Sequence, residues 1–259
     1  MQNAAWLSTI QFLSSPHAPY LFCGFILLVF IFALLDGMVR LNEVAKATKN
    51  ATALIEAAPD SQALYEQFEQ LNDRFAKLPL YANAWHEFSK TVILDPVRTL
   101  IRITRRPAEY FNAGSIIAAR LNIRLFNAMP GYLISLGLFF TFIGLVAAIA
   151  IAAAGLGAAD VAKTQAALVQ LLDVASLKFI SSVAGISLSI ILSVAQKAQY
   201  NRVTLLLSAF GAAIERRTQL VTMEQLLQQW LASQENVTRG YAHLAEDIAT
   251  EIALQIKKV

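Results

Sequence analysis

The chain has 259 residues, of which 15% are charged, with a mean hydropathy of +0.51 and a formal net charge of +3. This composition fits a protein that crosses a membrane several times better than it fits a soluble domain. The single cysteine, Cys23, excludes an intrachain disulfide and a cysteine-based metal cluster.

Three apolar segments are each long enough to cross a bilayer, at 19–36, 130–156 and 178–197. They predict an all-α membrane protein with three transmembrane helices. The residues before them, 1–18, predict an interfacial helix on the periplasmic surface, with Trp6 at the depth of the lipid headgroups.

The basic residues are distributed unevenly among the connecting segments. Twelve Lys and Arg residues lie in 37–129 and seven lie from Lys197 onward, whereas the second connection holds only Lys163, with Lys178 at the expected membrane edge. The positive-inside rule therefore predicts a periplasmic N-terminus and a cytoplasmic C-terminus in the inner membrane of a bacterium. This topology also accounts for the pI near 9.0 without nucleic-acid binding.

The segment 37–129 is predicted to form a cytoplasmic helical domain. Asp60 or Ser61 can cap a helix that continues to Leu78. Apolar residues in that helix recur at spacings of four, three and four, which predicts a buried stripe of Leu64, Phe68, Leu71 and Phe75.

Three further features are expected in this domain. A helix over 84–94 should end at Asp95 and Pro96. The basic run RTLIRITRRP, residues 98–107, is expected to be a solvated face, with contact to acidic lipid or an acidic partner as the alternative. The pattern over 108–129 predicts one helix that continues directly into the second apolar segment.

The remaining segments are also predicted to be helical. Residues 157–177 are too apolar for a plain linker and predict a periplasmic loop with a helix on the outer face. Residues 198–259 predict a continuous cytoplasmic helix, and its sequence stops without a Gly or Pro signal, which leaves open whether the tail continues. A heptad rhythm predicts that these tails form a coiled coil through Leu220, Met223, Leu227, Trp230, Val237, Tyr241, Leu244 and Ile248.

Two of the apolar segments carry a face of small residues at helical spacing. Small side chains let helices approach closely in a membrane, so these faces predict helix packing, either by itself or around a hydrated pore. The first face consists of Gly137, Thr141, Gly144 and Ala148, and the second consists of Ser182, Gly185, Ser189 and Ser193.

The sequence offers little catalytic chemistry. It contains no phosphate-binding glycine loop and no spacing typical of metal ligands or of a catalytic triad, so we expect neither an enzyme nor a cofactor or metal site. Ion-translocating proteins usually place an acid at membrane depth, but no Asp, Glu, Lys, Arg or His lies within the most apolar stretches, 19–35, 133–154 and 179–196. An ion path would therefore need an acid from another polypeptide, with Thr141 and Ser182 as its hydroxyl partners.

Two short motifs resemble the proton-channel family that includes MotA, TolQ and ExbB. Residues 137–145, GLFFTFIGL, are similar to the GLFGTxxGI segment of that family, and residues 182–186, SVAGI, are similar to its Thr-Ala-x-Gly-Leu segment. The likeness is close over 129–194 and elsewhere concerns only the layout. The chain departs from the family pattern at Phe140, at Ser182 and in lacking a proline in the third apolar segment.

The resemblance implies a pentameric ring of this chain around a dimer of a single-span partner similar to MotB, TolR or ExbD. That partner would supply the aspartate and bind peptidoglycan, and flow of H⁺, with Na⁺ as the alternative, would turn one ring relative to the other. By the motif match, Thr141 and Ser182 correspond to the two pore hydroxyls.

The helical extension beyond the third apolar segment is most similar to the ZorA branch, which serves in anti-phage defence. An energiser of envelope machinery of the TolQ and ExbB type is the second interpretation, and a flagellar stator, which has four spans, is the third. A non-conducting membrane scaffold is the rival from another class. A self-sufficient channel is disfavoured because no charged ring lines the apolar segments.

Overall fold

The computed structural model describes residue 15, residues 17–156 and residues 161–256. The predicted interfacial helix over 1–18 falls almost entirely outside these residues. Contacts along the chain define two compact units: the first comprises Met1–Lys49 and Asn112–Leu207, and the second comprises Asn50–Phe111 and Ser208–Val259. Helices dominate both units.

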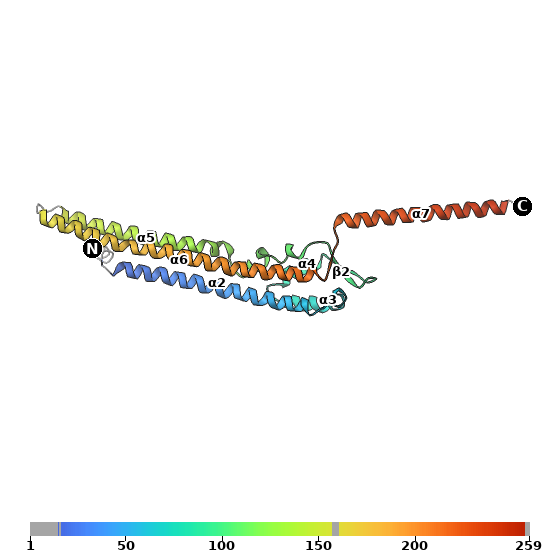
Figure 1. Ribbon diagram of the computed structural model, residues 1–259, viewed down its shortest axis with the longest axis horizontal. Helices are drawn as coiled ribbons and strands as arrows, with labels where there is room; N and C mark the ends of the chain where they lie inside the picture. The colour runs from blue at the N-terminus through green and yellow to red at the C-terminus, as the bar shows by residue number, and fades with distance from the viewer. Residues whose placement is uncertain (1–14, 16, 157–160, 257–259) are drawn as a thin grey trace, which may run out of the picture. The chain divides into compact units, whose positions relative to one another are not determined.

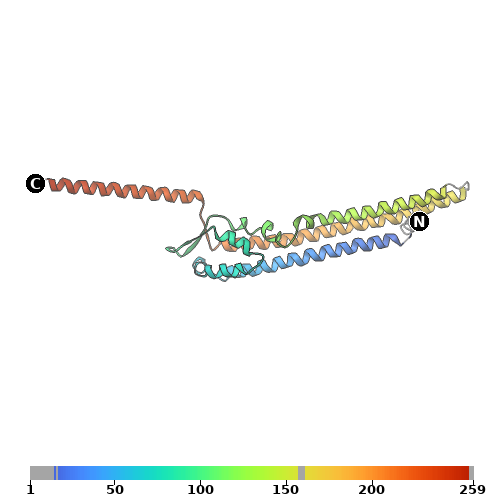
Figure 2. The same ribbon diagram turned by 180° about the vertical axis from the view of Figure 1, so that it is seen from behind.

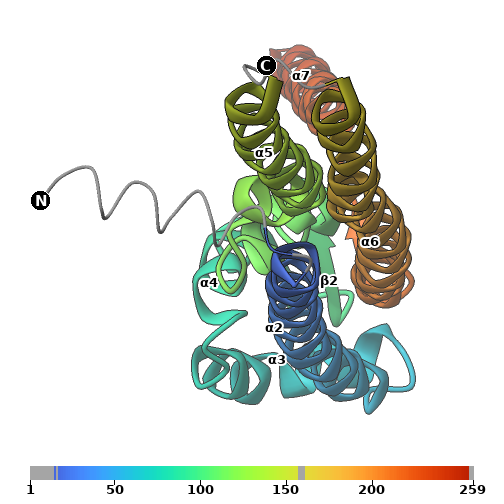
Figure 3. The same cartoon turned by 90° about the vertical axis from the view of Figure 1, so that its left-hand side faces the viewer.

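Three long helices build the first unit: α2 (Ala18–Glu56), α5 (Ile123–Leu156) and α6 (Val161–Glu215). Their segments in this unit run side by side, with α5 antiparallel to the other two (Figures 1 and 2). Seen end-on, α2 lies across from the α5–α6 pair (Figure 3). Each helix is long and apolar enough to cross a membrane, which confirms the three predicted spanning candidates.

The core of the first unit lies where these three helices meet. It contains Ile26, Phe30 and Ala33 of α2, Leu133 of α5 and Leu192 of α6. Large apolar side chains on the other faces are exposed in the single chain, as expected for helices that face lipid or neighbouring subunits.

The prediction of one helix from 108 into the second apolar segment is wrong. A 3₁₀ turn (Pro107–Glu109) and a π-helical turn (Ala113–Ile117) come first, and α5 begins only at Ile123. The physical reason is capping by asparagine, which favours a helix start. Asn112 Oδ1 accepts a hydrogen bond from the Ser115 amide, and Asn122 Oδ1 accepts one from the Leu125 amide, each at 3.1 Å.

The expected separate helix over 157–177 is also not found. From Val161 onward the chain forms a single helix, α6, that continues through the third apolar segment to Glu215. No proline interrupts this stretch, so nothing in the sequence forces a break between the connection and the span.

The second unit contains the helix predicted after Asp60. Helix α3 (Ser61–Ala76) is capped by Asp60, whose carboxylate accepts a hydrogen bond from the Ala63 amide at 2.8 Å. The predicted stripe is confirmed, because its buried residues are Leu64, Phe68, Leu71 and Phe75.

An aromatic cluster packs α3 against α4 (Ala82–Ser89). The rings of Phe75 and Trp85 stack with centroids 3.9 Å apart, and Trp85 Nε1 donates a hydrogen bond to Asn72 Oδ1 at 2.7 Å. Phe210, near the end of α6, contacts the ring of Phe75 with centroids 6.0 Å apart. The second unit therefore has a core of its own.

A small sheet corrects the all-α prediction. Strands β1 (Val92–Asp95) and β2 (Leu100–Ile103) pair antiparallel, and β3 (Gln219–Leu220) pairs parallel with β2. The helix expected over 84–94 thus ends at Ser89, and part of the basic run is strand. Asp95 Oδ1 accepts hydrogen bonds from the Val97 and Arg98 amides, both at 3.1 Å, which fixes the turn of the hairpin.

The tail is not one continuous helix from the third apolar segment. Helix α6 ends at Glu215, and α7 (Met223–Ile256) begins after β3. Tertiary contacts stop α6, because Arg217 Nε donates to the Ala58 carbonyl at 2.6 Å and the Val221 amide donates to the Ile103 carbonyl at 2.9 Å.

Candidate functional site

Thr141 lies on the buried face of α5, where its side chain joins this helix to α6. Thr141 is 5% exposed, and its Oγ1 lies 2.9 Å from the Gly137 carbonyl oxygen and 3.2 Å from that of Lys178. Its Oγ1 also lies 3.0 Å from Ser181 Oγ, and either hydroxyl can be the donor. The only strongly buried polar group of the first small-residue face is thus fully hydrogen-bonded.

Ser181 completes a small hydroxyl cluster with Thr141. Ser181 Oγ donates to the Lys178 carbonyl at 2.9 Å, and Ser181 is buried. Each hydroxyl carries a single proton, so the two protons are shared among the Gly137 carbonyl, the Lys178 carbonyl and the two hydroxyl oxygens. The cluster can therefore exchange donor and acceptor roles without changing its packing.

Two glycines let α5 and α6 approach closely beside this cluster. A Cβ atom added to Gly137 would lie 2.8 Å from the Ser181 carbonyl oxygen, and one added to Gly185 would lie 2.7 Å from the Leu133 carbonyl oxygen. Real Cβ atoms do not come so close to backbone. The α5–α6 junction therefore requires glycine at both positions.

The structure places the side chain of Lys178 in this junction. Lys178 is 2% exposed, and its aliphatic stem lies across Gly144, where an added Cβ would be 2.7 Å from Lys178 Cδ. Its Nζ donates to the Ser15 carbonyl at 3.3 Å. Gly144 thus leaves room for the stem of a lysine that lies just outside the apolar stretch 179–196.

Most of the predicted site residues are buried in the first unit. Besides Thr141, the buried ones are Gly137, Gly144, Ala148, Gly185 and Ser189.

Ser182, predicted as the second pore hydroxyl, is only partly buried. Thr141 contacts Ser181 instead. The hydroxyl that meets Thr141 thus belongs to the residue immediately before the predicted one.

The buried face of α6 explains why the sequence pattern indicated Ser182 and not Ser181. Its buried polar residues are Lys178, Ser181, Ser189 and Gln196, at spacings of three, eight and seven. Ser182 lies next to this face, and three-residue spacing to Gly185 made it appear to be part of it. Gln196 Nε2 makes no hydrogen bond with the residues that the structure describes.

Phe140 explains one departure from the family motif. It stands where the resembled motif has glycine, and its ring stacks on Phe22 of α2 with centroids 4.4 Å apart and an interplanar angle of 4°. A second α2 ring, Phe25, meets it edge-on. The larger side chain thus packs α5 against α2, on a different side from the Thr141 cluster.

The site holds hydroxyls but no acid of its own. The apolar parts of the three helices, 18–35, 125–156 and 179–196, contain no Asp or Glu. In the part of the chain that the structure describes, no three His, Cys, Asp or Glu side chains are grouped so that they could hold a metal ion. What the site can do chemically is donate and accept hydrogen bonds toward water or toward a carboxylate brought by another chain.

Comparisons with known proteins agree on one family. A family model described as the anti-phage protein ZorA of the Zorya type I system matches residues 5–257. The chain is also 23% identical over 266 residues to the Zorya protein ZorA of Escherichia coli O139:H28 (strain E24377A / ETEC). That match covers 96% of the chain but 35% of the relative, so the chain spans about a third of the length of this curated protein.

Proposed function

The chain belongs to the ZorA-like family of type I Zorya anti-phage systems, and we propose that it is the outer-ring subunit of an ion-driven rotary motor. In this proposal five copies surround a dimer of a ZorB-like partner with a single span, an aspartate at membrane depth and a peptidoglycan-binding part. The ion is H⁺, with Na⁺ as the alternative. Flow of the ion turns the ring and carries torque to the cytoplasmic tail.

One observation carries the proposal. A buried threonine hydroxyl, on Thr141, sits in the junction of α5 and α6, whose apolar parts, 125–156 and 179–196, contain no carboxylate. Ionisable groups inside a membrane mark ion pathways, and a hydroxyl can serve such a pathway by hydrogen-bonding the carboxylate or its waters. A carboxylate from a second chain would complete a relay that this chain cannot form alone.

The proposed orientation follows from charge. With the N-terminus in the periplasm, the basic segment 37–129 and the tail both face the cytoplasm of the inner membrane. In the single chain, the tail helix α7 leaves Leu227, Trp230 and Tyr241 of its heptad exposed. Association of several tails would bury these side chains.

A scaffold without ion flow is the second candidate, and one observation favours it. Thr141 already has hydrogen-bond partners within its own chain, on Gly137, Lys178 and Ser181. A hydroxyl satisfied in this way needs no water or carboxylate. Membership in the ZorA-like family favours defence over the energising of envelope machinery, but it does not choose between a motor and a scaffold.

An ion-flux measurement tests the proposal. The full chain and the single-span protein encoded beside it would be reconstituted into liposomes, and acidification would be followed under an imposed membrane potential. The motor predicts flux that is lost in Thr141→Val and kept in Thr141→Ser, with the native mass of the complex unchanged. Equal flux in wild type and Thr141→Val, or no flux in the intact wild-type complex, would support the scaffold.

A further inference from the structure

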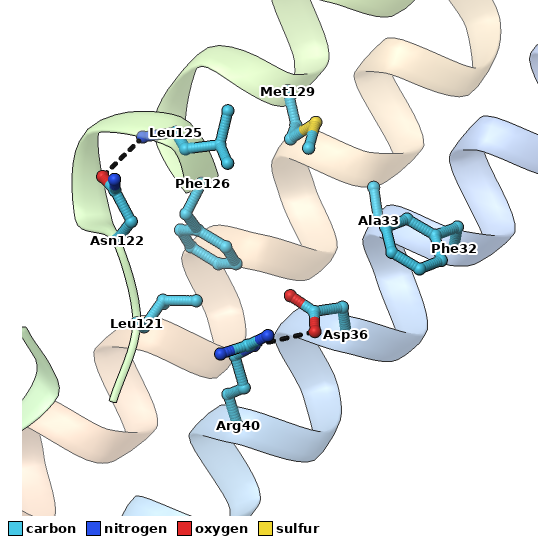
Figure 4. A pocket seen from close by; sticks show the side chains of 9 residues that line it. All are labelled: Phe32, Ala33, Asp36, Arg40, Leu121, Asn122, Leu125, Phe126 and Met129. Carbon is cyan, nitrogen blue, oxygen red and sulfur yellow. Dashed lines mark hydrogen bonds and ion pairs between the residues drawn. The ribbon is translucent and has the colours of Figure 1, made fainter. Parts of the chain in front are cut away.

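A cavity of about 140 Å³ opens in the first unit between α2 and the start of α5. Its polar wall is the part of α2 that carries Asp36 and Arg40, and Asn122 lies on the opposite side of the cavity (Figure 4). Its apolar wall consists of Phe32, Ala33, Leu121, Leu125, Phe126 and Met129.

This cavity lies where both helices change from apolar to charged sequence. Asp36 is the first charged residue after the apolar stretch of α2, and Arg124 is the last one before the apolar stretch of α5. In a membrane-spanning helix, such a change marks the boundary between hydrocarbon and headgroups. The apolar wall therefore lies at the depth of acyl chains, and the polar wall lies at the depth of phosphates.

The polar wall retains donors for a ligand. Arg40 Nε binds Asp36 Oδ1 at 2.7 Å, and Arg40 Nη1 donates to the Arg120 carbonyl at 3.2 Å. A guanidinium has five N–H donors, so three remain, and the Arg40 side chain is 44% exposed. The planar fork of arginine suits the oxygens of a phosphate.

The charges around the cavity favour an anion. Arg120 is paired with Glu43 at 2.6 Å, and Arg124 is exposed. Together with Arg40 and Asp36, three cations stand against two carboxylates, which leaves one excess positive charge at the membrane boundary. An acidic headgroup is therefore attracted to this place more strongly than a zwitterionic one.

We infer that this cavity binds an anionic phospholipid of the surrounding bilayer. One acyl chain lies against Phe126 and Met129, and the phosphate accepts hydrogen bonds from Arg40. The inference requires only that the chain spans a membrane, and it is independent of ion flow. The bound lipid would fill the space between α2 and α5 and so help to hold the two helices at a fixed separation.

Native mass spectrometry of the detergent-extracted full chain tests this site, with phosphatidylglycerol and phosphatidylcholine of identical acyl chains as probes. We expect phosphatidylglycerol to bind about fivefold more tightly, the factor given by one basic residue near an acidic headgroup. The variant Arg40→Gln should abolish this preference, because it removes both the donors to the phosphate and the excess positive charge, while the Asp36 side chain is 38% exposed and stays solvated. Thermal unfolding verifies that each variant is folded.

A cavity-filling variant tests the apolar wall. Leu125→Trp should reduce binding of both lipids, whereas Ile134→Trp, a matched change at an exposed α5 position outside the cavity, should leave it unchanged. Equal affinity for the two lipids, or unchanged binding in folded Leu125→Trp, overturns the inference. A loss of oligomer mass in Leu125→Trp with unchanged lipid binding would show instead that a second copy of the chain occupies the cavity.

Discussion

The Thr141 hydroxyl lies 3.0 Å from the hydroxyl of Ser181, across the junction of α5 and α6. The neighbouring Ser182, which the family motif singles out, is only partly buried and does not take part in this contact. The two adjacent serines therefore have different roles. Ser181 belongs to the packing of one protomer, and Ser182 remains accessible to water, to a neighbouring copy or to a partner chain.

The two serines should respond differently to the same substitution. Ser181→Ala removes a buried hydrogen bond within the protomer and should lower the free energy of unfolding by about 1 kcal/mol, with ion flux retained. Ser182→Ala should leave stability unchanged and abolish flux. Thermal unfolding in detergent and flux in liposomes measure the two effects. Flux that is lost in Ser181→Ala and kept in Ser182→Ala would exclude Ser182 from the ion path and leave Thr141 and Ser181 as its hydroxyls.

Thr141→Val tests whether the threonine hydroxyl is needed for more than shape. Valine keeps the volume and branching but cannot bond Ser181 or the Gly137 carbonyl, while Ser181 can still donate to Lys178. We expect a normal native mass and loss of phage protection in cells. Thr141→Ser, which restores the hydroxyl, should protect as wild type does. Protection by Thr141→Val at the wild-type level would remove the hydroxyl from the mechanism.

Glycine should be required only where the backbones meet. Gly185→Ala places a methyl group 2.7 Å from the Leu133 carbonyl oxygen, so α5 and α6 must separate, at a cost on the order of 1–3 kcal/mol. Gly131→Ala is the matched control, because an added Cβ there meets nothing within 4 Å. Melting temperatures in detergent compare the two. Equal effects would mean that helix propensity, and not close packing, decides both.

The aromatic cluster should carry much of the stability of the second unit. Phe75→Ala removes a fully buried ring that stacks on Trp85. It should lower the free energy of unfolding by about 3–5 kcal/mol. Gln70→Ala, at an exposed position of the same helix, should cost less than about 0.5 kcal/mol. Denaturant unfolding of the full chain followed by Trp fluorescence measures the difference. A small effect of Phe75→Ala would show that the core can collapse around the gap.

Tail association can be tested by cross-linking. In a Cys23→Ser background, Val237→Cys lies on the predicted heptad seam of α7, and Asn236→Cys lies one residue away on the outer face. Oxidation should link tails through position 237 much faster than through position 236, because seam residues of neighbouring helices face each other. Equal rates at both positions would argue against a coiled coil.

The elements that sequence predicts correctly are those with a strong local pattern. Long apolar stretches give the three spanning candidates, and the spacing of Leu64, Phe68, Leu71 and Phe75 gives the buried face of α3. In both cases the pattern of apolar residues lies within a single helix. It can therefore be recognised without knowing which distant segments pack against that helix.

Helix ends and the sheet were harder to predict, although some signals were present. The Thr222–Gln225 pair forms reciprocal hydrogen bonds at 3.3 Å, and its T-x-x-Q spacing is a capping signal that marks the start of α7. The pairing of β3 with β2 joins segments more than a hundred residues apart, and short strands carry little local signal. Tertiary contact thus overrides the local helical pattern.

The hydroxyl cluster and the buried lysine show a second limit of sequence reasoning. Whether Ser181 or Ser182 meets Thr141 depends on a rotation of α6 by one residue, which composition alone does not fix. Lys178 is buried because Gly144 on another helix makes room for its stem. Such pairings between helices are properties of packing.

The central claim is that ion flow through a complex of this chain passes beside Thr141 and drives a rotor. Proton flux into liposomes that contain the wild-type chain and its single-span partner tests it most directly, with the Thr141→Val complex measured in parallel. The account predicts potential-driven flux for wild type and the background rate of protein-free liposomes for Thr141→Val, at equal native mass. Equal flux in the two complexes, or none in an intact wild-type complex, would contradict it.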